Sequence, residues 1–152
     1  MSLRTIIEDK YKKAIKTKNA NETNTLRLIK SAIIDKDISS RSGSSTEGIA
    51  DVEILSLLQN LIKQRKDSID SFKLASRKDL IAIEQDEIDV ISQFLPQQLN
   101  EEDTEKIIEK IISENNFSTL KDMGALMKNL KSSKAGSIDM TLAGKIAKSK
   151  LS

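Results

Sequence analysis

Large apolar residues recur at intervals of three and four along almost the whole chain, which is the periodicity of amphipathic α-helices. Ile54, Leu58, Leu61 and Ile69, for example, fall on one face of a single helix. The pattern therefore predicts an all-α fold. Its seven expected helices span about 2–17, 22–39, 52–74, 77–94, 101–115, 119–131 and 139–151.

Residues that can cap a helix precede several of these segments. Ser2, Asp51 and Asn100 are expected N-caps, because each side chain can accept a hydrogen bond from a backbone N–H of the first turn. Ser76 followed by Asp79 resembles a capping box at the start of the fourth helix. The short connection at that point predicts that the third and fourth helices form an antiparallel hairpin.

Two interruptions divide the chain. Residues 39–50, SSRSGSSTEGIA, are rich in serine and glycine and predict a mobile connecting loop. Pro96 is the only proline and disfavours helical backbone at the residue before it. We therefore expect an N-terminal bundle of four helices at residues 1–95 and a small C-terminal domain of three helices at residues 96–152.

Two glycines lie inside the expected helices of the second domain, at Gly124 and Gly144. Glycine in a helix interior is less favourable than alanine by about 1 kcal/mol. Close contact between neighbouring helices is the expected reason for keeping a glycine at both positions.

The 152 residues include neither histidine nor cysteine. This excludes disulfides, thiolate nucleophiles, Ser-His-Asp triads and zinc sites built from these residues. It also removes the commonest general base near neutral pH. Acidic runs at 84–89 and 101–105 could offer carboxylates to Mg²⁺, but the first is spread around a helix and the second begins one. A binding domain without catalytic residues, metal or cofactor is favoured over an enzyme.

No apolar stretch is long enough for a transmembrane helix, and residues 1–19 lack the uninterrupted apolar core of a signal peptide. A cytoplasmic location is therefore expected, without membrane attachment. The N-terminal segment is rich in lysine and amphipathic, which leaves an organellar matrix as the alternative. Glu8 and Asp9 argue against that alternative.

The net charge of +2 is unevenly distributed along the chain. Residues 1–30 carry a net charge of +5, residues 31–120 carry −8, and residues 121–152 carry +5. Two basic ends flanking an acidic middle point to a polyanionic partner.

The segment KQRKDSIDSF, at residues 63–72, raises two alternatives for its cations. Arg65 falls beside the apolar stripe of its helix, and the expected hairpin brings it level with Glu84 and Glu87. A structural clamp between Arg65 and one of these carboxylates is favoured, because a cation near a core is costly unless it is paired. The alternative is an anion-binding pocket formed by Lys63, Arg65 and Lys66.

A second group of cations lies in the tail. Lys128, Lys131 and Lys134 are spaced by three residues and precede a Ser/Gly loop, and Lys145, Lys148 and Lys150 follow on the last helix. Together they could follow a phosphate backbone. No aromatic residue accompanies them, so recognition would rest on backbone and shape rather than on base stacking or sequence. The alternative is an ordinary solvated face.

Five segments in order resemble the YqeY family, the stand-alone form of the GatB/YqeY domain. They are NTLRLIK at 24–30, KQRKDSIDSF at 63–72, ASRKDL at 75–80, FLPQQLNEE at 94–102 and KDMGALMKNLK at 121–131. The resemblance covers essentially the whole chain and implies an all-helical architecture of two parts. The related segment is the C-terminal part of the B subunit of glutamine-dependent aspartyl/glutamyl-tRNA amidotransferase, whose tail contacts tRNA.

The resemblance implies a role in RNA binding rather than chemistry. It makes Lys121, Lys128, Lys131 and Lys134 candidates for tRNA contact, and the turn KAGSID departs from the corresponding run in relatives. The family label of carbon–nitrogen ligase with glutamine as amido donor describes the larger enzyme, because this chain lacks the domain that holds the active site. The alternative is a protein–protein adaptor that docks on an amidotransferase or an aminoacyl-tRNA synthetase.

Overall fold

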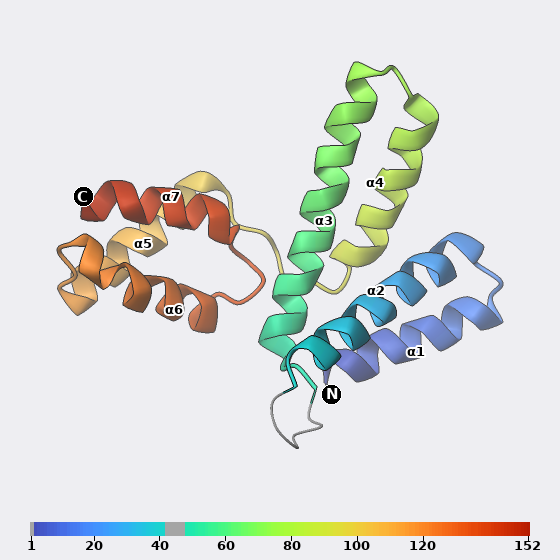
Figure 1. Cartoon of the computed structure of the whole chain (residues 1–152), viewed down its shortest axis with the longest axis horizontal. Helices are drawn as coiled ribbons and strands as arrows, with labels where there is room; N and C mark the ends of the chain where they lie inside the picture. Colours follow the sequence, from blue (N-terminus) through green and yellow to red (C-terminus); the bar gives the residue numbers. More distant parts are fainter. Residues whose placement is uncertain (1, 42–47) are drawn as a thin grey trace. The chain divides into compact units, whose positions relative to one another are not determined.

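A computed structural model describes residues 2–41 and 48–152, and Figure 1 shows the arrangement of their helices. The described part is all-α, which confirms the predicted fold class. Its helices are α1 (Leu3–Lys16), α2 (Ala20–Ser39), α3 (Asp51–Leu74), α4 (Lys78–Ser92), α5 (Glu101–Asn115), the short 3₁₀ helix η1 (Leu120–Asp122), α6 (Met123–Ser133) and α7 (Met140–Leu151). Half of the expected mobile loop, residues 42–47, lies outside the described residues.

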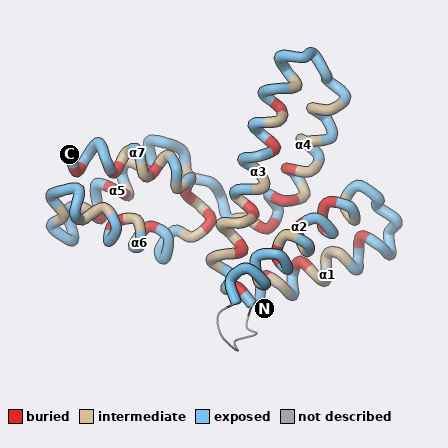
Figure 2. Tube along the Cα trace, viewed as in Figure 1, coloured by how far each residue is buried: buried red, intermediate tan, exposed pale blue. Residues whose placement is uncertain are grey.

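The chain forms two compact units, Met1–Leu95 and Pro96–Ser152. In the first unit, α1 and α2 form one hairpin and α3 and α4 form the predicted second one, and α2 packs against both α3 and α4. Side chains from the four helices form one apolar core. Figure 2 colours the buried residues of these helices red. The core has at its centre Ile7, Leu26, Ile29, Ile54, Leu58 and Ile91.

In the second unit, α5, α6 and α7 pack against one another around a smaller core. The chain leaves α6, turns at residues 134–139 and returns as α7, so these two helices lie side by side (Figure 1). The buried face of α7 consists of Ala143, Ala147 and Leu151, and it shares a core with Leu126 and Leu130 of α6.

Two of the predicted N-caps are confirmed and one is wrong. Ser2 accepts a hydrogen bond from the Thr5 amide, and Asn100 accepts one from the Asp103 amide. Asp51 is instead the first residue of α3. Its carboxylate accepts a hydrogen bond of 3.2 Å from the amide of Leu3, so it caps the start of α1 rather than its own helix.

The expected capping box at Ser76 is also wrong. Ser76 has a φ of 55° and closes the preceding helix α3. The amide of Arg77 donates to the carbonyl of Phe72 and the amide of Ser76 donates to the carbonyl of Lys73, which is the Schellman arrangement. Because Ser76 is held in this left-handed conformation, Arg77 becomes the residue before α4, and its side chain pairs with Asp79 instead.

Close helix contact does not explain the two glycines of the second unit. A Cβ atom added at Gly124 would meet no heavy atom within 4 Å, apart from its own helix backbone and chain neighbours, in the described part of the chain. A Cβ atom added at Gly144 would lie 3.9 Å from Cε of Met127, which is an ordinary contact. Both sites therefore have room for alanine.

Candidate nucleic-acid interface

The candidate lysines of the tail lie on the outer surfaces of η1, α6, α7 and the α6–α7 turn. Burial of Leu126 and Leu130 fixes which side of α6 faces the core. Lys128 and Lys131 follow these leucines at positions turned toward solvent. The six candidates are all exposed: Lys121, Lys128, Lys131, Lys134, Lys145 and Lys148.

Three other lysines of this unit form ion pairs with carboxylates of α5. Lys106 lies 3.4 Å from Glu102, and Lys110 lies 3.9 Å from Glu114. Lys150, near the end of α7, lies 2.7 Å from Glu109 and 2.9 Å from Glu105. Its hydrogen bonds, the stronger to Glu109 and the weaker to Glu105, hold the pKa of Lys150 above its ordinary range. The sequence analysis grouped Lys150 with the basic surface, but its partners on α5 remove it.

The six candidate lysines have no such partners. Within residues 2–41 and 48–152, no carboxylate makes an ion pair with any of them. The two acids that share their part of the sequence are occupied as helix caps. Asp122 accepts hydrogen bonds from the amides of Ser118 and Thr119, which lowers its pKa, and Asp139 accepts from the amides of Thr141 and Leu142.

The turn between α6 and α7 is fixed by its own backbone contacts. The carbonyl of Ser137 accepts a hydrogen bond of 2.8 Å from the amide of Leu99, and the carbonyl of Gly136 accepts one from the side chain of Gln98. Gly136 is buried and has a φ of 77°, a conformation that favours glycine. The departure of KAGSID from the family pattern therefore still leaves an ordered turn, with Lys134 exposed at its start.

Arg65 in the first unit faces the interior of the α3–α4 hairpin. Its Nε atom lies 2.7 Å from Oε2 of Glu87, and its Nη1 atom donates to the carbonyl of Leu61 at 2.9 Å. Of the two partners considered from the sequence, Glu87 forms the ion pair. Lys63 and Lys66 are exposed while Arg65 is buried, so the three cations do not converge on one pocket.

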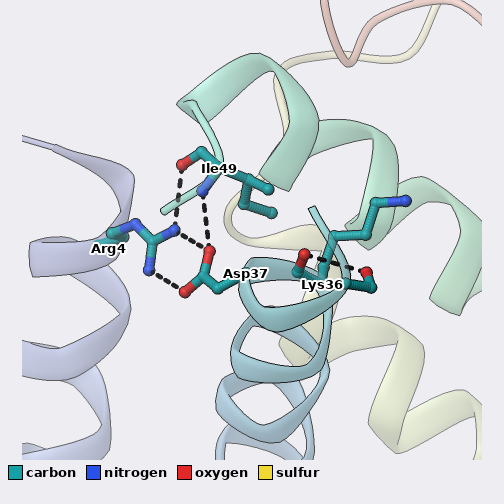
Figure 3. Close-up of polar contacts among 5 residues, drawn as sticks. Arg4, Lys36, Asp37 and Ile49 are labelled. Atoms are coloured by element: carbon teal, nitrogen blue, oxygen red, sulfur yellow. Dashed lines mark hydrogen bonds and ion pairs between the residues drawn. The ribbon is translucent and has the colours of Figure 1, made fainter. Parts of the chain in front are cut away.

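One polar cluster in the first unit was missed by sequence reasoning. Both guanidinium Nη atoms of Arg4 contact the carboxylate of Asp37, at 2.5 and 2.9 Å, as Figure 3 shows. Asp37 also accepts a hydrogen bond from the amide of Ile49, whose carbonyl accepts one from Arg4. This cluster joins α1, α2 and the segment that leads into α3. In the register set by the Glu8–Lys30 pair, residue 4 lies level with residue 34, so folding the hairpin about its connection would not have predicted the contact with Asp37.

A second unpredicted feature surrounds Tyr11, the only tyrosine. The ammonium of Lys30 lies 4.2 Å from the centre of its ring and 2.7 Å from Glu8, while Arg27 donates to its hydroxyl. Cations next to the face of an aromatic ring are attracted to it. These contacts join α1 to α2 and identify no ligand.

The described residues contain no group of three or more Asp, Glu, His or Cys side chains that could hold a metal ion. In the same part of the chain, no helix has both the length and the apolar character needed to cross a membrane.

The family model of Yqey-like proteins matches residues 4–151. The chain belongs to the YqeY family. The match confirms the resemblance drawn from the five sequence segments and extends over both units.

Proteins similar to this chain in sequence include altered inheritance of mitochondria protein 41, mitochondrial. The protein of that name from Saccharomyces cerevisiae is 34% identical over 92 residues, which are 60% of this chain and 48% of that protein. The protein from Clavispora lusitaniae is 34% identical over 131 residues, 83% of this chain and 72% of that protein. The chain thus spans about half the length of the S. cerevisiae relative it matches.

Proposed function

We propose that the C-terminal unit, Pro96–Ser152, is a tRNA-binding module that holds the phosphate backbone and performs no chemistry of its own. One observation carries the proposal. The lysines of η1, α6, the α6–α7 turn and the outer side of α7 are exposed and unpaired, whereas Lys106, Lys110 and Lys150 are paired with acids of α5.

The physical basis is that the unpaired lysines of this unit lie apart from the carboxylates of α5, which pair with Lys106, Lys110 and Lys150. Unpaired ammonium groups gain free energy when they displace counterions from a nucleic-acid backbone. The one aromatic residue of the unit, Phe117, is half-buried and packs against the apolar core, so it is not free to stack on a base. Contacts to phosphates without base stacking favour recognition by backbone and shape, and no DNA sequence specificity is expected.

The choice of tRNA rests on the resemblance to the amidotransferase B-subunit tail. Amide transfer is not assigned to this chain, whose 152 residues include neither histidine nor cysteine and resemble the tail of that subunit. The names of the yeast relatives include the word mitochondrial, which supports an organellar matrix for this chain as the alternative to the cytoplasm. Both compartments contain tRNA, so the proposal holds in either.

The test measures binding of labelled tRNA by fluorescence anisotropy for wild type and two charge variants. The Lys128→Ala/Lys131→Ala/Lys134→Ala variant removes cations from the proposed interface. The Lys106→Ala/Lys110→Ala variant removes exposed but paired cations from α5 and serves as the control. We expect affinity to fall at least tenfold for the first variant and to change by less than twofold for the second. Equal effects of the two variants would contradict the proposal.

A second candidate is the adaptor, favoured by apolar side chains exposed on the α3–α4 hairpin. Leu74 is 92% exposed and Ile83 is 54% exposed. If the hairpin docks on an amidotransferase or a synthetase, the purified proteins should co-elute in size-exclusion chromatography. A Leu74→Ser/Ile83→Ser variant should then lose the complex while keeping tRNA affinity. Separate elution of the wild-type proteins would argue against the adaptor.

A further inference from the structure

One glycine in the lysine-bearing helix has no structural reason to be glycine. Gly124 is exposed in the first part of α6, and a Cβ atom placed there would meet no atom within 4 Å outside its own helix and chain neighbours, among the described residues. Its φ is not positive, unlike that of Gly136, so alanine could adopt its backbone conformation. Neither packing nor backbone geometry therefore explains the glycine at this position. Glycine is also a poorer helix former than alanine.

The neighbours of Gly124 on the same face are lysines. Lys121, Gly124, Lys128 and Lys131 follow one another at intervals of three, four and three residues. Gly124, Lys128 and Lys131 have the spacing of residues on one side of α6, and Lys121 belongs to the 3₁₀ helix η1 that precedes it. The opposite side carries Leu126 and Leu130, which are buried in the core.

The face therefore combines positive charge with helix backbone that is left uncovered at Gly124. Lys121 lies before Gly124, and Lys128 and Lys131 lie after it, about 6 and 10 Å further along the helix axis for a rise of 1.5 Å per residue. Long lysine side chains can extend around a group that rests on the glycine. A methyl group at Gly124 would hold such a group further from the backbone.

We propose that a phosphate group of the RNA strand rests against the backbone of α6 at Gly124, between Lys121 and the pair Lys128 and Lys131. The inference deepens the proposed function and rests on it, because it names where on the interface the strand makes its closest approach. The group recognised at this position is a phosphodiester of a folded RNA. Contact with a phosphate also explains why α6 has glycine at position 124, although glycine lowers the stability of a helix.

The test compares two single substitutions of the same kind. Gly124→Ala and Gly144→Ala both replace a helical glycine that has room for a methyl group, on α6 and α7 respectively. Both should raise the melting temperature of the full-length protein, by roughly 4 to 8 °C for the transition of the C-terminal unit. Gly124→Ala should nevertheless weaken tRNA binding about five- to tenfold, and Gly144→Ala should leave it unchanged. A Gly124→Leu variant should weaken binding further.

The outcomes separate the two levels of the argument. If the Gly124→Ala protein is stabilised and binds tRNA like wild type, the close approach at Gly124 is overturned. The proposed function would still stand in that case, provided that tRNA binding depends on Lys128 and Lys131. Loss of binding together with loss of stability would also overturn the inference, because it would assign Gly124 to folding. If wild-type protein binds no tRNA, the proposed function itself fails.

Discussion

Replacing Arg65 with alanine should destabilise the N-terminal unit more than any substitution of an exposed cation. Arg65 is only 8% exposed and lies inside the α3–α4 hairpin. Its guanidinium holds Oε2 of Glu87 at 2.7 Å and the carbonyl of Leu61 at 2.9 Å. The substitution removes both contacts and the packing of the long side chain, and it leaves Glu87 without its partner.

The magnitude follows from how well water can reach Glu87. Removing one partner of a fully buried pair costs about 3 to 5 kcal/mol. The Glu87 side chain keeps 29% of its exposure and can be partly hydrated, so we expect a loss of about 2 to 3 kcal/mol in the free energy of unfolding. For a unit of this size, the loss corresponds to a decrease of roughly 8 to 24 °C in melting temperature.

The assay is urea denaturation of the full chain followed by far-ultraviolet circular dichroism, with one transition fitted for each unit. Lys66→Ala, an exposed neighbour of Arg65, is the control and should change the unfolding free energy by less than about 0.5 kcal/mol. In the double variant Arg65→Met/Glu87→Leu, apolar packing replaces the pair, and most of the loss should be recovered. Wild-type stability in Arg65→Ala, or a double variant weaker than the single one, would refute the reasoning.

The remaining predictions concern the Arg4–Asp37 cluster and the α3–α4 connection. The hydrogen bond from Arg4, helped by the Ile49 amide, holds the pKa of Asp37 below its ordinary value in the folded protein. The ionised carboxylate therefore stabilises the fold fully above the unfolded pKa of about 3.9, and this stabilisation is lost as pH falls through the folded pKa. Asp37→Asn should flatten the decline in melting temperature below pH 4. Gly48→Ala should cost about 1 to 2 kcal/mol in urea denaturation, because the new Cβ would lie 2.8 Å from Cζ of Arg4 and 2.9 Å from Oδ1 of Asp37; unchanged stability would contradict this. Ser76→Gly should raise the unfolding free energy by about 1 kcal/mol, since Ser76 has a φ of 55°, and a decrease would show that its side chain matters more than its conformation.

The helices themselves were predictable because the apolar period depends only on local sequence. Most of the expected boundaries fall within two residues of those observed, and the Arg65–Glu87 pair follows from folding the third helix back on the fourth. The same arithmetic applied to the first hairpin brings residue 4 level with about residue 34 and would have missed Asp37. Register within a hairpin is thus only partly accessible to sequence reasoning, even when the connection is short.

The errors have a different physical origin. Asp51 and Ser76 have side chains suited to capping, but the neighbouring chain decides which helix end they serve. Gly124 and Gly144 look alike in the sequence, and only the positions of atoms around them show that neither is crowded. Lys150 was grouped with the basic surface because its partners on α5 lie 41 and 45 residues earlier in the chain, a pairing that local patterns do not determine.

The central claim, that the lysines of η1, α6 and α7 hold a tRNA backbone, is tested most directly by the salt dependence of binding. The measurement is the slope of log affinity against log salt concentration for wild type and for the Lys128→Ala/Lys131→Ala/Lys134→Ala variant. Each phosphate contact contributes about 0.7 to 0.9 to this slope, so the account predicts a slope shallower by about 2 to 3 in a variant that remains folded. Binding with the same slope in both proteins, or no binding by wild type, would contradict it.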